Sequence, residues 1–282
     1  MSSKFVEISK LINRYFVVKA NCKNKNTINA KILIELAKYD VNIILLSATI
    51  VDKPLYFNIV GYVLGLYETL EDGNNLFTMA QWFPRLCVYS DFQGWQNRQF
   101  TGRGEFALAF GNYDVTITLP ADHIVLSTGV CQNYAQVLSP AQMARWNQAQ
   151  NAKEPVEIAT LEEANKAEKT KSTQKKTWVY KAENVRDFAW TSSRRYIWDA
   201  MPAYVEGKKV MCMSGYPKEA YNLYRKYSTK AVAHTIKSYS KFSIPYPYPV
   251  AQSLEASNGM EYPMICFNYG RTSADGTYTE SA

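Results

Sequence analysis

Asn258-Gly259-Met260-Glu261-Tyr262-Pro263 is a short polar and aromatic stretch that leads directly into the apolar run at residues 264–268. This run, and a second one at 209–213, have the length and composition of buried strands. Between them, residues 218–241 predict one long helix, because side chains for a buried stripe recur near helical spacing at Tyr224, Tyr227, Ala231, Thr235 and Tyr239. Strands that flank a long helix predict an α+β class for this part of the chain.

An alternating pattern marks the middle of the chain. Residues 104–110 and 113–119 alternate apolar and polar side chains on either side of Gly111-Asn112. This pattern predicts a hairpin in an antiparallel sheet, with the turn at Gly111-Asn112.

The first 75 residues have a different character. Residues 31–38 predict a short amphipathic helix, residues 41–46 an apolar strand, and residues 55–67 an apolar helix after Pro54. A helix, strand and helix in this order predict a fragment of a parallel α/β sheet.

Changes in composition divide the chain into four segments. Five of the six Trp lie in 82–190, and none precedes the polar stretch at 73–75. Residues 139–176 are rich in Ala, Gln, Glu and Lys, which favours an exposed helical linker. The expected segments are therefore 1–75, 76–138, 139–176 and 177–282.

Charge and cysteine usage exclude several classes. The net charge is +7, but basic residues are interleaved with acids along the chain, so a nucleic-acid partner is not expected. The five cysteines are scattered and contain no Cys-x-x-Cys pair, which argues against a disulfide framework and a zinc knuckle. Without a signal peptide or a membrane span in the sequence as written, we expect a cytoplasmic protein.

Several motifs, in order, resemble the gluzincin zinc metallopeptidases, specifically the membrane alanyl aminopeptidase family. The resemblance covers residues 76–282. It rests on the stretches 77–85, 94–95, 104–106, 113–120, 182–189, Tyr246-Pro247-Tyr248-Pro249 and Gly259-Met260-Glu261. It implies an antiparallel β-sandwich, the aminopeptidase N-terminal domain, followed by a thermolysin-like α+β domain, with the α/β fragment in front.

The resemblance also implies a site for a peptide substrate. Glu261 matches the carboxylate that pairs with the substrate's free α-ammonium group, and Gly259 and Met260 would offer backbone groups at a sheet edge. Gln81 matches a position that lines the first side-chain pocket. Tyr262 stands where many members have Asn, which bears on specificity. Without the flanking motifs, Glu261 reads as a solvated turn carboxylate and Gln81 as a strand residue bonded to backbone.

Zinc is the family's cofactor, held by His-Glu-x-x-His and a distant Glu. This sequence has two histidines, His123 and His234, and no pair four residues apart. We therefore expect no zinc to bind this chain, no catalytic residue, and a thermolysin-like domain that ends before the zinc motif. A domain that ends there lacks the helices that carry the metal ligands. The run 264–267 would then be an exposed apolar edge that promotes self-association.

A second resemblance concerns residues 1–75. Ser47, Ala48 and Thr49, within the stretch 42–54, resemble the Ser-Ala-Thr motif of superfamily-two helicases of large DNA viruses. No Gly-x-x-x-x-Gly-Lys phosphate loop accompanies it, so ATP hydrolysis is not expected.

The leading expectation is thus an aminopeptidase-like metallopeptidase polypeptide that carries the amino-terminus anchor without the zinc site. Two alternatives stay open: a helicase-related nucleic-acid module, and a non-enzymatic peptide-binding protein. A requirement for a free peptide amino terminus would separate the peptide-binding hypotheses from the nucleic-acid module, which would instead bind DNA in a salt-sensitive way.

Overall fold

The structure, a computed structural model, describes residues 15–19, 42–46, 76–80, 82–83, 86–96, 107–256, 259–269, 272–273 and 276–278. The chain forms two compact units, Met1–Asn75 and Leu76–Ala282. The boundary between these units adjoins the polar stretch 73–75.

The first unit contains a parallel pair of strands. β1 (Tyr15–Lys19) pairs in parallel with β2 (Asn42–Leu46). The strand expected at 41–46 is therefore confirmed, and its parallel pairing agrees with an α/β fragment. The helices expected at 31–38 and 55–67 lie outside the described residues.

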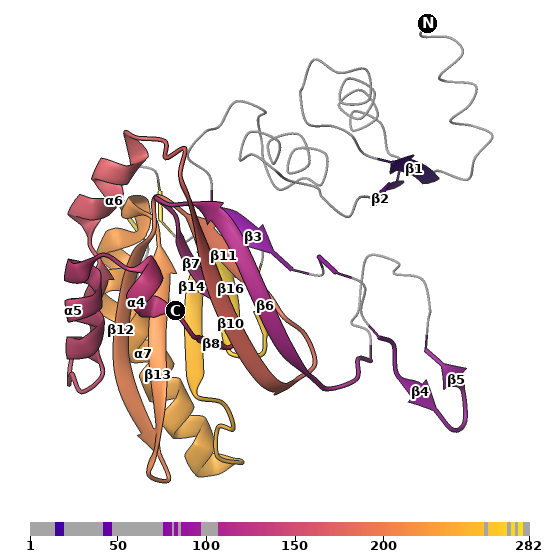
Figure 1. Ribbon diagram of the computed structural model, residues 1–282. Helices are drawn as coiled ribbons and strands as arrows, with labels where there is room; N and C mark the ends of the chain where they lie inside the picture. Colours follow the sequence, from indigo (N-terminus) through magenta and orange to yellow (C-terminus); the bar gives the residue numbers. More distant parts are fainter. Residues whose placement is uncertain are drawn as a thin grey trace, which may run out of the picture. The chain divides into compact units, whose positions relative to one another are not determined.

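The second unit is built around a six-stranded sheet (Figure 1). Its order is β15-β16-β14-β13-β12-β9. The strands are β9 (Val156–Ala159), β12 (Ile197–Val205), β13 (Lys208–Tyr216), β14 (Val250–Ala256), β15 (Met260–Tyr262) and β16 (Ile265–Tyr269). β14 is parallel to both β13 and β16, and the other neighbouring pairs are antiparallel.

Smaller antiparallel sheets are formed by strands between residues 77 and 193 of this unit. One has the order β6-β10-β8, the next β3-β11-β7, and the last pairs β4 with β5. Their strands are β3 (Phe77–Met79), β4 (Tyr89–Ser90), β5 (Gly94–Trp95), β6 (Gly111–Pro120), β7 (Ile124–Ser127), β8 (Val130–Cys131), β10 (Lys175–Val185) and β11 (Trp190–Ser193).

The described residues also contain four α-helices, so the class is mixed α+β, as expected. The helices are α4 (Tyr134–Val137), α5 (Pro140–Ala149), α6 (Leu161–Glu168) and α7 (Tyr221–Phe242), with a 3-10 turn η1 (Lys218–Ala220) before α7. Among the described helices, none is both long and apolar enough to cross a membrane.

The two faces of the six-stranded sheet contact different partners. On β13, Met211 and Met213 pack into the main core, whereas Val210 and Cys212 cluster with Ala233 of α7. This division follows from the alternation of side chains along a strand. Helix α7 therefore covers one face of β12 to β14, and the smaller sheets contribute to the core on the other.

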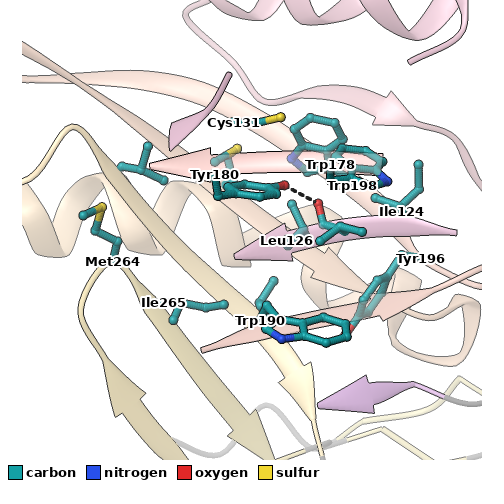
Figure 2. Close-up of a cluster of buried hydrophobic side chains, with 14 of the residues drawn as sticks. Ile124, Leu126, Cys131, Trp178, Tyr180, Trp190, Tyr196, Trp198, Met264 and Ile265 are labelled. Atoms are coloured by element: carbon teal, nitrogen blue, oxygen red, sulfur yellow. Dashed lines mark hydrogen bonds between the residues drawn. The ribbon is translucent and has the colours of Figure 1, made fainter. Parts of the chain in front are cut away.

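Large aromatic side chains fill the main core (Figure 2). Trp178 of β10 and Trp198 of β12 are fully buried. Tyr180 is also buried, and its hydroxyl donates a hydrogen bond to the Val125 carbonyl at 2.9 Å. This bond gives the buried phenol its partner, which is what allows a polar group to lie in such a core.

The segment 139–176 differs from the exposed helical linker that its composition predicts. Its two helices are present, and both begin with a capping box, at Ser139 and Thr160. Between them, however, β9 joins the six-stranded sheet, and its Ile158 is fully buried. The polar composition concealed this strand because only its last residues enter the core.

The hairpin expected around Gly111-Asn112 is also corrected. β6 includes the strand expected at 113–119, but Gly111 and Asn112 belong to this strand rather than to a turn, and β6 pairs with β10 rather than with the preceding residues. Of that preceding stretch, residues 107–110 are described and contain only an isolated bridge from Leu108 to Cys87. Alternation identifies a strand but not its partner.

A division of the second unit at residue 177 does not match its sheets. β11 and all but the first two residues of β10 lie in the expected segment 177–282, yet these strands pair with β6, β8, β3 and β7 from 76–138.

The run 264–267 is not an exposed apolar edge either. Met264, Ile265 and Phe267 are at most 4% exposed, because the smaller sheets cover that face.

The long helix and its flanking strands are confirmed, but the buried stripe is not. Tyr224 is buried, and the buried face continues through Thr229 and Ala233. The other four residues of the expected stripe lie at the surface, namely Tyr227, Ala231, Thr235 and Tyr239. Small residues occupy the contact because they let the helix approach the sheet closely.

Candidate functional site

The strand that carries Glu261 lies at an edge of the six-stranded sheet. β15 is the first strand in the sheet order and pairs with β16 on one side. Within the described part of the chain, no strand pairs with its other side. Backbone groups along such an edge are available to a further extended chain.

The side chains of β15 alternate between two environments. Met260 and Tyr262 are half-buried against the main core, and the Tyr262 ring lies 5.9 Å from the Phe267 ring, edge to face. Glu261 is exposed and lies opposite Cys266. Since directly opposite residues share a face, Glu261 lies on the face that α7 partly covers.

A tight turn fixes the end of β15. Pro263 and Met264 connect β15 to β16, and Met264 has a positive φ of 66°. A non-glycine residue in this region costs about 1–2 kcal/mol. Burial of the Met264 side chain in the main core offsets that cost, and Figure 2 shows this side chain beside Ile265.

Side chains from other strands hold this turn in place. The Thr128 hydroxyl donates to the Pro263 carbonyl at 3.0 Å. The buried amide of Gln252 donates to the Ser127 carbonyl at 2.7 Å and to the Met264 carbonyl at 3.4 Å. The turn after Glu261 is thus tied to the end of β7 and to β14, which positions the strand that carries the carboxylate.

A chain of hydrogen bonds runs from beneath α7 to the residue opposite Glu261. Its members are small polar side chains on the α7 face, and each bond is 2.8–3.3 Å long. In order they are Thr229, Ser214, Ser228, Ser253, Asn268 and Cys266. These mutual bonds satisfy polar groups that would otherwise destabilise the half-buried face.

Cys266, the last member of this series of hydrogen bonds, has a protonated thiol. Burial raises the pKa of its thiol above the usual value, and the charge of Glu261 raises this pKa further. The thiol donates to the Asn268 side-chain oxygen at 3.3 Å. The environment of Glu261 therefore combines one exposed carboxylate with neutral neighbours on the same face.

Two strands in from the edge, the same face carries a second carboxyl group. Glu255 of β14 lies opposite Asn268. Its pKa is raised to about 7, first by burial and then by the charge of Glu219, against the opposing charge of Arg195. Arg195 itself pairs with Glu219 and Glu168. Glu255 thus changes its charge near neutral pH.

The structure brings together only some of the expected site residues. Gly259, Met260, Glu261 and Tyr262 lie on or next to β15. Gln81 lies outside the described residues, as do Ser47, Ala48 and Thr49.

Three residues around the site escaped the sequence analysis: Thr128, Gln252 and Glu255. A signal was present for two of them, since Gln252 and Glu255 interrupt the otherwise apolar or small run 250–256.

Neither histidine fits a zinc site. His123 is buried and bonds through Nδ1 to the Ser192 hydroxyl at 3.3 Å. Burial, then the charge of Arg194, lowers its pKa to about 4. His234 lies on the exposed side of α7. Among the described residues, no group of three or more His, Cys, Asp or Glu is placed to hold a metal ion. The expectation about zinc remains a prediction.

In comparisons with known proteins, no protein-family model matches the chain and no curated protein matches its sequence.

Proposed function

We propose that this chain is an aminopeptidase-like polypeptide of the gluzincin metallopeptidase class, and that β15 binds the amino-terminal end of an extended peptide. The observation that carries the proposal is the position of Glu261. It is exposed on an edge strand whose adjoining turn is fixed by Thr128 and Gln252.

The physical argument has two parts. An extended peptide can add to a sheet edge through main-chain hydrogen bonds, which fix its direction and register. A carboxylate at a fixed place on that edge then favours a peptide whose terminal ammonium group lies within reach. The edge supplies most of the contacts, and Glu261 supplies the preference for a free amino terminus.

The finer fold assignment belongs to the same proposal. We assign the smaller antiparallel sheets to an aminopeptidase-type N-terminal β-sandwich and the six-stranded sheet with α7 to a thermolysin-like domain. The large sheet contains both parallel and antiparallel neighbours, and its edge strand β15 is antiparallel to β16, which supports this assignment.

The proposal is limited to binding. Hydrolysis in this class depends on a histidine pair four residues apart, which together with a carboxylate leaves an open metal position for water. The sequence has two histidines, and His123 and His234 are far apart along the chain. We expect the purified chain to retain no stoichiometric zinc and to leave aminoacyl-anilide substrates uncleaved.

The test compares one fluorescent peptide with a free and with an acetylated amino terminus, by fluorescence anisotropy. We expect millimolar binding, with the free peptide favoured by up to about fivefold, because an exposed ion pair contributes at most about 1 kcal/mol. Glu261→Gln should abolish the preference without abolishing binding.

Glu183→Gln is the matched control, since Glu183 is an exposed carboxylate on strand β10. It should leave the preference intact. A preference that persists in Glu261→Gln, or equal binding of both peptides to the unaltered chain, would contradict the proposal.

A further inference from the structure

A second feature lies at the end of the six-stranded sheet where α7 ends. Helix α7 connects β13 to the parallel strand β14, so its last turn lies at the end of the sheet where β13 begins. This end is at the bottom of Figure 1, where the turn between β12 and β13 also lies. Residues from α7 and from the start of β13 are therefore neighbours there.

Helix α7 is strongly basic. Its sequence contains five Lys or Arg residues and no Asp or Glu. The exposed basic residues follow one another at intervals of three or four, which places them on one side of a helix. They are Lys226, Lys230, His234, Lys237 and Lys241.

Acidic partners neutralise only the first half of this helix. Arg225 pairs with Glu157 at 2.8 Å, and Lys230 pairs with Glu154 at 2.5 Å. For Lys237 and Lys241, no acidic partner is found within the described residues. Lys241 instead lies 5.3 Å from the centre of the Phe242 ring.

Large exposed apolar side chains lie in the last turn of α7 and directly after it. Tyr239 is 72% exposed, Phe242 82% and Ile244 75%. With Lys208, Lys237 and Lys241 they form what we call the basal tip. Lys208 begins β13 and, by alternation with Val210 and Cys212, lies on the α7 side of the sheet. The exposed Glu206 in the adjoining turn opposes these charges.

The combination of charges and apolar groups selects the partner. Exposed aromatic and aliphatic side chains favour insertion into the boundary between lipid headgroups and acyl chains, while lysines beside them attract anionic headgroups. A nucleic acid would use the lysines and could stack on Phe242 or Tyr239, but it would gain little from Ile244. We propose that the basal tip binds the surface of an anionic lipid bilayer peripherally.

The test is co-sedimentation of the full chain with phosphatidylcholine vesicles, with and without phosphatidylglycerol. We expect binding only when phosphatidylglycerol is present, and weaker binding as salt increases. The double variant Phe242→Ser/Ile244→Ser should bind at least about tenfold more weakly. Lys237→Gln and Lys241→Gln should each weaken binding by about fivefold.

Matched controls distinguish vesicle binding through the basal tip from nonspecific binding through any exposed apolar or basic side chain. Phe92→Ser removes an equally exposed Phe, also 82% exposed, from the turn between β4 and β5. Lys171→Gln removes an exposed lysine after α6. Both should bind like the unaltered chain, and all variants should keep its melting temperature.

Four results would overturn the proposal: no vesicle binding, equal binding to neutral and anionic vesicles, unchanged binding of the basal-tip variants, or binding to DNA in place of vesicles. None of them bears on the peptide preference assigned to Glu261, so the two proposals fail independently.

Discussion

At the scale of single residues, His123 makes the clearest contribution to pH dependence. Its ring is buried beside Phe77, with 5.7 Å between ring centres, and its pKa falls from 6.5 to about 4. The unfolded chain therefore binds more protons than the folded chain between these two values. This contribution to stability is complete above about pH 6.5 and is lost as the pH falls towards 4.

We therefore predict that His123→Phe reduces the loss of stability in acid. Phe keeps the contact with Phe77 but has no proton to bind. Relative to this variant, the unaltered chain should lose about 2–3 kcal/mol of unfolding free energy between neutral pH and pH 4. Asp199 and Glu255 have raised pKa values and act in the opposite direction, but they are present in both proteins and cancel in the difference.

Urea unfolding of both proteins across this pH range measures the effect. Parallel pH profiles for the two proteins would show that His123 is as easily protonated in the folded chain as in the unfolded one.

Sequence reasoning at this scale proposed Glu261, whose role stays a prediction, but it did not propose Thr128 or Gln252. The motif around Gly259 placed a carboxylate near a sheet edge, and the structure has it exposed on β15. The contacts that Thr128 and Gln252 make could not be anticipated, because their partners are the carbonyls of residues far away in the sequence. Hydrogen bonds to a backbone carbonyl require no particular partner residue, so they leave no sequence pattern.

At the scale of elements, the partner strands of β10 and of β11 decide which parts of the chain fold together. Both strands lie after residue 174 but form sheets with strands from 76–138. Trp178 and Trp190 also contribute to the main core from these strands. Residues 177–282 alone would therefore expose strand edges and a large apolar surface.

We predict that an isolated fragment 177–282 does not fold cooperatively, whereas 76–282 does. Thermal unfolding followed by near-ultraviolet circular dichroism compares the two, because it reports on packed Trp and Tyr side chains. A cooperative transition in 177–282 would show that the main core does not need the smaller sheets.

Individual elements were predictable where local pattern decides them. The apolar strands β13 and β16 and the long helix α7 followed from composition and spacing. The partner of β6, the membership of β9 in the large sheet and the buried face of α7 did not, because long-range packing decides them. The prediction that Tyr227 and Tyr239 belong to the buried face of α7 was wrong for this reason, because the smaller Thr229 and Ala233 occupy that face.

At the scale of the whole molecule, the chain consists of the compact units Met1–Asn75 and Leu76–Ala282. Units with separate contacts commonly fold and unfold separately. We predict that deletion of residues 1–75 leaves the proteolytic fragments of 76–282 unchanged. Limited proteolysis with mass spectrometry measures this, and new cleavage sites within 76–282 would show that the two units depend on each other.

The central claim concerns the whole second unit: its sheets and turn contacts hold β15 as an edge that receives a peptide by its amino terminus. Nuclear magnetic resonance of the isotope-labelled chain locates such binding even when it is weak. On addition of a short peptide with a free amino terminus, we predict that the backbone amide signals of Met260, Glu261 and Tyr262 shift most. The acetylated peptide should shift them less at the same concentration. Shifts confined to other strands, or identical shifts with both peptides, would contradict the claim.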